Sequence, residues 1–155
     1  MIVYRFMSEE EYNKLMRGET LVNTTKHESK TDSVGFCFMP MEQDVPEEAY
    51  RYMSGIVSND VCVVFDVAEE ELQESYGIYS NPNTFIWGDC VQKTEYCTTE
   101  YDKKRFRPLR VCKDYSWWFR PMRDKNWTWK KIRRIRGYER EKWNRGNIRY
   151  DFARV

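Results

Sequence analysis

The sequence predicts an α+β domain in which a mixed or antiparallel sheet is covered by two or three helices. Its length of 155 residues suits one domain with a sizeable core. Residues 61–67, VCVVFDV, are almost wholly apolar, which predicts a strand buried on both faces. Ser8 and Glu11 have the spacing of a capping box, which predicts that a helix begins just after Ser8.

The N-terminal half is expected to alternate strands and helices. Residues 2–7 read as a short strand, and the helix after Ser8 carries acidic residues in its first turn and ends at Gly18. A second helix is expected from about Pro46, because proline suits the first turn of a helix. The further expectations for this half are short strands at 20–23 and 34–40 and a polar loop at 24–33.

The middle of the chain is expected to contain more loop than strand. The acidic run 68–75 reads as a short helix or turn, and 76–85 reads as a loop because it holds Gly, Asn and Pro. Residues 90–101 are rich in Val, Thr and Tyr and predict a strand. A charged turn at 102–106 and another short strand follow.

The C-terminal third predicts a helix and a strand. Ile132, Ile135 and Tyr138 recur every third residue, which favours a helix with a narrow apolar stripe. The early part of 147–155 alternates apolar and charged residues, as a strand does.

Charge divides the chain into two parts within one expected domain, 1–155. Residues 1–100 hold 7 Lys or Arg and 19 Asp or Glu, a net charge of −12. Residues 101–155 hold 19 Lys or Arg and 6 Asp or Glu, a net charge of +13, and five of the six tryptophans. We therefore expect an acidic α+β core, about 1–111, and a basic aromatic segment, 112–155, that forms an interaction surface or matches the acidic core electrostatically.

Several classes of site are not indicated. The five cysteines form no C-x-x-C pair and His27 is the single histidine, so neither a metal site nor a Ser-His-Asp triad is expected. The chain contains no Walker phosphate loop, no G-x-G-x-x-G and no G-x-S-x-G. The N-terminus lacks the pattern of a signal peptide and no apolar run approaches about 20 residues, so a cytoplasmic protein is expected.

A spaced set of polar residues carries the functional prediction. Arg5 lies on the first predicted strand, KTDSVGFCF leads into a later strand, and KTEYCTTEY follows the apolar strand at 61–67. This order resembles the ADP-ribosyltransferase fold of the toxin-like Arg–Ser–Glu class. The resemblance implies a core over about 2–111 that uses NAD as its substrate.

The resemblance also implies roles for individual residues. Arg5 would bind the NAD phosphates, which an arginine can do with two hydrogen bonds. Glu95, with Glu100 as the alternative, would stabilise the oxocarbenium-like transition state. Thr31 and Ser33 would stand for the Ser-x-Ser pair, and Tyr96, Phe36 or Tyr79 would stack on nicotinamide. The chain departs from the family pattern in the Thr-Asp-Ser motif and in Lys93, which precedes Glu95 where the family usually has Glu or Gln.

The basic aromatic segment allows three interpretations. It binds a nucleic acid through phosphates and stacked bases, it lies on an anionic membrane surface, or it packs across the acidic core. The residues expected to bind a nucleic acid or another partner are Trp127, Trp129, Lys130, Lys131, Arg133, Arg134 and Arg136.

Two functions therefore compete. The first is an enzyme that transfers ADP-ribose from NAD to a macromolecular target, which the basic segment presents or recognises. The second is a non-catalytic module that grips a nucleic acid or a nucleic-acid-handling protein. By analogy, small cysteine-reduced proteins of this kind occur among toxins and phage-encoded inhibitors of host defence.

Overall fold

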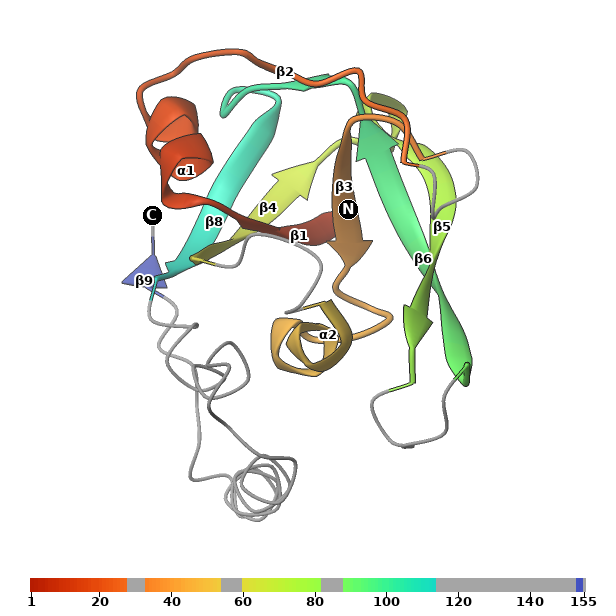
Figure 1. The fold of residues 1–155 in the computed structure, drawn as a ribbon. Coiled ribbons are helices and arrows are strands. Elements are labelled where there is room, and N and C mark those ends of the chain that lie inside the picture. The colour runs from red at the N-terminus through yellow and green to blue at the C-terminus, as the bar shows by residue number, and fades with distance from the viewer. Residues whose placement is uncertain (28–32, 54–59, 82–87, 114–152, 155) are drawn as a thin grey trace.

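The computed structural model describes residues 1–27, 33–53, 60–81, 88–113 and 153–154 (Figure 1). These residues form a seven-stranded sheet in the order β5-β6-β3-β1-β4-β8-β9, and every neighbouring pair in it is antiparallel. Two α-helices and a small two-stranded sheet accompany it. The predicted α+β class with an antiparallel sheet is thus confirmed.

The centre of the sheet is made by the first strand of the chain. β1 (Ile2–Met7) pairs with β4 (Val61–Val67) along its whole length and with β3 (Phe36–Pro40) on its other side. Six of the seven residues of β4 are buried, as its apolar sequence predicts for a strand covered on both faces.

The outer strands extend the sheet on both sides of this centre. β6 (Cys90–Thr98) pairs with β3 and carries β5 (Gln73–Ser80) outside it, whereas β8 (Phe106–Cys112) pairs with β4 and carries β9 (Ala153–Arg154). The small sheet joins β2 (Leu21–Val22) to β7 (Glu100–Tyr101), which follows β6 almost directly.

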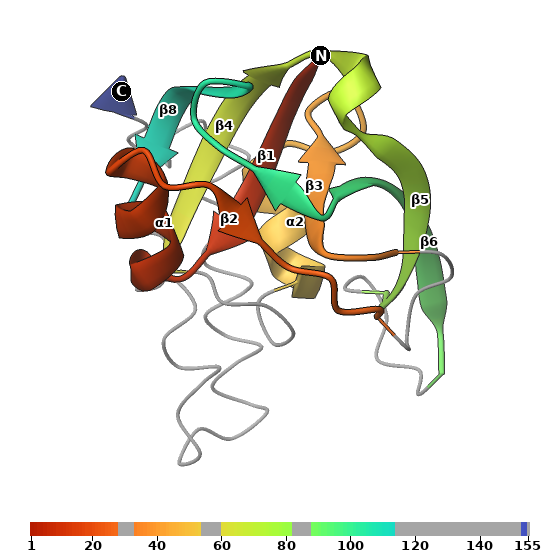
Figure 2. The same cartoon turned by 90° about the horizontal axis from the view of Figure 1, so that it is seen from above.

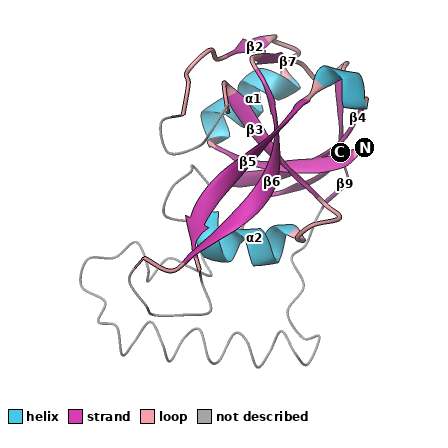
Figure 3. Ribbon diagram, turned by 90° about the vertical axis from the view of Figure 1, so that its right-hand side faces the viewer, coloured by secondary structure: helices cyan, strands magenta, loops and turns pink. Residues whose placement is uncertain are grey.

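The main sheet has a different cover on each face (Figures 2 and 3). α1 (Glu9–Met16) and the β2–β7 pair cover the face that includes Val3 and Val63, which we call the α1 face. α2 (Pro46–Met53) covers the face that includes Tyr4 and Val64, which we call the α2 face. Each face buries its own apolar cluster, so successive residues of β1 and β4 contribute to opposite layers.

At the start of α1, one of the two hydrogen bonds of the predicted capping box is present. The Ser8 hydroxyl accepts a hydrogen bond from the backbone N–H of Glu11 at 3.1 Å. The Glu11 carboxylate instead binds the guanidinium of Arg5 through two hydrogen bonds of 2.7 and 3.0 Å, and it accepts a third from the Tyr101 hydroxyl at 2.7 Å. This one carboxylate therefore joins α1 to β1 and β7.

The loop predicted at 76–85 is wrong in its first part, because residues 73–80 form β5. Ser75, Gly77 and Tyr79 are buried along this strand, which is the alternation expected of a sheet with one covered face. The short 3-10 helix at Glu69–Glu71 agrees with the first part of the helix or turn predicted at 68–75, whose last residues, from Gln73, instead belong to β5.

Predictions for most of the C-terminal segment lie outside the described residues. They include the helix near 130–143 and most of the strand at 147–155, of which β9 is the described part. Two arginines near the end of the acidic core pair with its carboxylates: Arg105 pairs with Glu71 and Glu100, and Arg107 pairs with Asp66. Within the described ranges, the helices are too short or too polar to span a membrane.

We predict that Glu11→Ala lowers the free energy of unfolding by about 2 kcal/mol in urea denaturation. Removing one partner of a fully buried ion pair costs about 3–5 kcal/mol. The Arg5–Glu11 pair is partly solvated, because each side chain is 17% exposed, so we expect a smaller cost.

The matched control is Glu10→Ala, which removes an acidic residue from the same helical turn. Glu10 is 78% exposed, and Lys14 in the next turn is its one ion-pair partner among the described residues, so its loss is expected to cost about 0.5 kcal/mol or less. If the two variants were equally stable, the contacts by which Glu11 joins α1 to β1 and β7 would not stabilise the fold.

Candidate functional site

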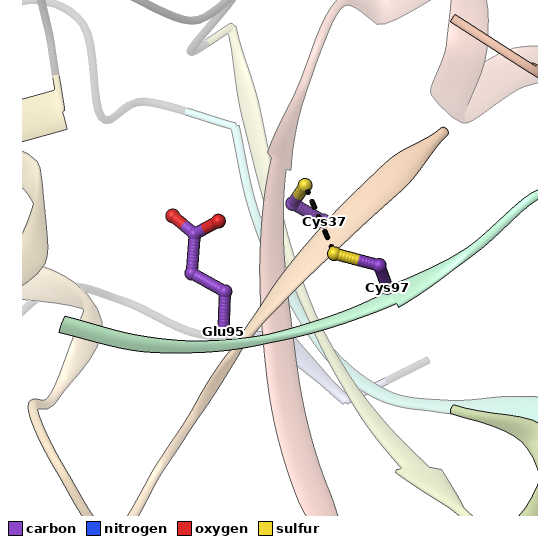
Figure 4. Close-up of side chains that lie close together, drawn as sticks. All are labelled: Cys37, Glu95 and Cys97. Atoms are coloured by element: carbon purple, nitrogen blue, oxygen red, sulfur yellow. Dashed lines mark hydrogen bonds between the residues drawn. The ribbon is translucent and has the colours of Figure 1, made fainter. Parts of the chain in front are cut away.

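A cluster of polar side chains lies on the α2 face, where β3, β6 and β5 run side by side. Glu95 and Cys97 are two residues apart on β6, so both project from the same face. Cys37 on β3 lies directly opposite Cys97, and the two Sγ atoms are 3.4 Å apart. Figure 4 shows the three side chains gathered on one side of these strands.

Two serines extend the cluster. Ser75 on β5 lies directly opposite Glu95, and its hydroxyl shares a hydrogen bond of 2.8 Å with the hydroxyl of Ser33. Both serines are buried, although serine is usually exposed. The chain around Ser33 is fixed locally, because its carbonyl accepts a hydrogen bond from the His27 backbone N–H at 3.1 Å.

Gly35 fixes the start of β3 next to this cluster. Its φ of +81° is readily adopted only by glycine, and a Cβ at this position would lie 2.5 Å from the carbonyl oxygens of Asn23 and Thr98. A larger residue would therefore push β3 away from β6.

Glu95 is the most deeply buried charged residue of the cluster, with an exposed fraction of 0%. The Tyr79 hydroxyl donates a hydrogen bond to its Oε1 atom. Room for this pair depends on Gly77, because a Cβ there would lie 2.6 Å from Glu95 Oε1 and 2.7 Å from Tyr79 Cε2. The glycine that favoured a loop in the sequence is thus required by packing inside a strand.

A second polar group adjoins the cluster near the start of α2. Asp44 Oδ2 accepts a hydrogen bond from the Tyr52 hydroxyl at 2.7 Å and lies 2.9 Å from Lys93 Nζ. Burial, and then the hydrogen bond to Asp44, raise the pKa of Tyr52 far above its usual value, so Tyr52 remains a neutral donor. The Tyr52 ring packs against the Tyr79 ring with centroids 5.0 Å apart, which connects the two groups.

The backbone beside Glu95 is held by the side chain of Gln43. Its amide donates to the Thr94 carbonyl at 3.1 Å, and its carbonyl accepts from the Thr94 N–H at 2.8 Å. This bidentate contact joins the segment before α2 to the middle of β6.

The Cys97 thiol is the acidic thiol of the cluster. The hydrogen bond from Cys37 is the main cause that lowers the pKa of Cys97 to about 7; burial opposes it, and a hydrogen bond from Ser33 assists it. Thiolate is the nucleophilic and metal-binding form of cysteine, so a low pKa favours reactions at sulfur. Together with Glu95, the cluster offers two sulfur ligands and one carboxylate on a buried face.

The structure does not bring Arg5 to this cluster. Its guanidinium lies on the α1 face, where it contacts Glu11 and sits over the rings of Phe36 and Phe38, 5.1 and 5.9 Å from their centroids. Burial is the largest single influence and would lower the pKa of Arg5, but the charge and hydrogen bonds of Glu11, together with smaller contributions from Tyr101 and Cys37, raise the pKa above its usual value. The roles that the resemblance implies require Arg5 to lie in one site with Ser33 and Glu95. This requirement is not met in the structure, because the Arg5 side chain lies on the α1 face and the Glu95 side chain on the α2 face.

The other predicted residues also separate. Phe36 lies on the α1 face beside Arg5, and Tyr96 lies opposite Phe38, away from Glu95. Glu100 is 52% exposed and pairs with Arg105, so it is not part of the cluster. Thr31 and all seven residues proposed for partner binding, Trp127, Trp129, Lys130, Lys131, Arg133, Arg134 and Arg136, lie outside the described residues. Ser33, Tyr79 and Glu95 are the predicted residues that the structure brings together.

Comparisons with protein-family models, curated proteins and solved structures gave no match.

Sequence reasoning missed several members of the cluster, above all Cys37, Cys97 and Ser75. The spacing of Glu95 and Cys97 on a predicted strand was a usable signal, because residues two apart share a face. The partnership with Cys37 had no signal in the sequence, since it depends on the register between strands that are far apart in the chain.

We predict that Gly77→Ala lowers the free energy of unfolding by about 1–3 kcal/mol in urea denaturation, because the added methyl group overlaps the Glu95–Tyr79 pair. Without this overlap the sign would reverse, because alanine in a strand is favoured over glycine by about 0.5–1 kcal/mol.

The control is Ser80→Ala on the same strand, where the side chain is exposed and the expected change is within about 0.5 kcal/mol. A Gly77→Ala protein as stable as the wild type would show that this space is not needed.

Proposed function

We propose that this protein transfers ADP-ribose from NAD to a macromolecular target and that Glu95 is its catalytic carboxylate. The observation that carries the proposal is the gathering of Ser33, Tyr79 and Glu95 on the α2 face, with Ser33 joined to Ser75 opposite Glu95. These are three of the residues to which the resemblance to ADP-ribosyltransferases gives roles in the nicotinamide pocket and at the reacting ribose.

The chemistry requires a carboxylate in a water-poor environment. Nicotinamide leaves the ribose with the electron pair of the glycosidic bond, and positive charge develops on the sugar. A nucleophilic atom of the target then bonds to the same carbon and releases its proton. The Glu95 carboxylate stabilises the developing cation, and its burial strengthens that interaction relative to water.

Tyr79 has two tasks under this proposal. Its hydroxyl holds the Glu95 carboxylate in one orientation. Its ring, which already packs against the ring of Tyr52, supplies an aromatic face for nicotinamide. Because Glu95 is fully and Tyr79 almost fully buried, NAD reaches them only when the surrounding side chains separate.

The proposal assigns the phosphate-binding cation to Lys93 in place of Arg5. Lys93 lies two residues before Glu95, on the same face of β6, and its ammonium group pairs with Asp44. Arg5 instead stabilises the fold through Glu11.

The test is incubation of the protein with labelled NAD and a cell lysate. The wild type is expected to label a macromolecule, and Glu95→Gln is expected to lower the labelling rate by about 10²–10³-fold, because the amide cannot neutralise the sugar cation. Glu100→Gln is the matched control, since Glu100 is an exposed glutamate five residues further along, and it should label at the wild-type rate.

Circular dichroism of each variant verifies that the fold is retained. Full activity of a folded Glu95→Gln protein would sink the assignment of Glu95. Absence of labelling by the wild type would contradict the transfer reaction itself.

A further inference from the structure

Three potential metal ligands meet on the α2 face. The Sγ atoms of Cys37 and Cys97 and a carboxylate oxygen of Glu95 all lie within 4.8 Å of one another (Figure 4). They come from two neighbouring strands, because Glu95 and Cys97 share a face of β6 and Cys37 lies directly across from Cys97. In the described part of the chain, no other group of three Cys, His, Asp or Glu side chains brings its ligand atoms this close together.

The distances agree with a single tetrahedral ion. Zinc binds thiolate sulfur at about 2.3 Å and carboxylate oxygen at about 2.0–2.2 Å, so two of its ligand atoms lie about 3.5–3.8 Å apart. The Sγ–Sγ distance of 3.4 Å is just below this range. The distances among all three ligand atoms have an upper bound of 4.8 Å, which is above the range. Small side-chain rotations without movement of either strand would therefore bring the three atoms to one ion.

The surroundings of the three side chains resemble those of metal ligands. Tyr79 donates a hydrogen bond to Glu95, and the buried hydroxyls of Ser33 and Ser75 share one beside Glu95 on the neighbouring strand. Hydrogen-bonding partners of this kind orient metal ligands and tune their affinity. Cys37 is half-buried, so the group is not completely enclosed.

We propose that Cys37, Cys97 and Glu95 bind one divalent cation of the zinc class. Two thiolates select a soft or borderline ion over magnesium or calcium, which prefer oxygen ligands. Binding displaces one proton from each thiol to the solvent. Three protein ligands leave a fourth position of the tetrahedron for a water molecule or another small ligand.

The chain contains an internal comparison for this site. Cys62 on β4 and Cys112 on β8 also lie directly opposite each other on the α2 face. No described carboxylate completes a three-ligand group with them. The described residues thus contain two pairs of facing cysteines, but only the pair of Cys37 and Cys97 has a carboxylate, that of Glu95, close enough to complete a three-ligand group.

The metal site does not rest on the proposed transfer of ADP-ribose. The two are nevertheless linked at Glu95, because a carboxylate that binds zinc is withdrawn from the ribose. A bound cation would therefore inhibit the transfer reaction.

The test uses the full chain, reduced with a phosphine and freed of metal with a chelator. Zinc is titrated in competition with a chromophoric chelator, and cobalt(II) is titrated separately because sulfur ligands give it a charge-transfer absorption. The wild type should bind one equivalent of either ion and show the sulfur-to-cobalt absorption. Cys37→Ser, Cys97→Ser and Glu95→Gln should each weaken binding by at least the roughly 10–100-fold caused by loss of a residue that supports a ligand.

Cys62→Ser is the control and should bind zinc as the wild type does. A reduced wild type that takes up no zinc would overturn the proposal, whatever the variants do. Weakening by Cys62→Ser equal to that by Cys97→Ser, with circular dichroism unchanged, would also overturn it. Zinc binding without NAD-dependent labelling would refute only the transfer reaction, and labelling without zinc binding would refute only the metal site.

Discussion

The register between β3 and β6 is the constraint on which the candidate site depends. It sets Cys37 opposite Cys97 and thereby turns Glu95 to the α2 face. A slip of β6 by one residue would turn Glu95 and Cys97 to the other face, away from Cys37. Two features fix the register: Gly35 fits between the carbonyl oxygens of Asn23 and Thr98, and Gln43 binds both backbone groups of Thr94. The site is thus built by backbone pairing and by contacts outside the polar cluster.

The same alternation separates two groups of polar residues. On the α1 face, the Arg5–Glu11 pair and the Tyr101 hydroxyl join the first strand, the first helix and the small sheet. Every described partner of this group belongs to the fold itself, so its role is structural. On the α2 face, Glu95 and its neighbours combine a carboxylate, two thiols and two phenols, and burial and hydrogen bonding shift the pKa values of Cys97 and Tyr52. Perturbed groups gathered in this way are typical of functional sites.

Local patterns predicted most of the described fold, whereas pairing between distant segments decided the site. The apolar run of β4, the capping residue Ser8 and the proline that opens α2 are signals within a few residues, and each marks the expected element. β5 was missed because Gly77 reads as a loop residue, although Glu95 on another strand explains it. Arg5 was misplaced as a site residue for a similar reason, since strand order does not reveal which face a side chain occupies.

Disulfide mapping tests the register most directly. The reduced, metal-free protein is oxidised briefly with copper–phenanthroline and digested, and its linked peptides are identified by mass spectrometry. The structure predicts that Cys37 links mainly to Cys97, because the two residues are directly opposite and their Sγ atoms are already 3.4 Å apart. The natural competitor is Cys90, which is exposed on the same strand. A dominant link between Cys37 and Cys90 would contradict the register, and with it the grouping of Glu95 with the two thiols.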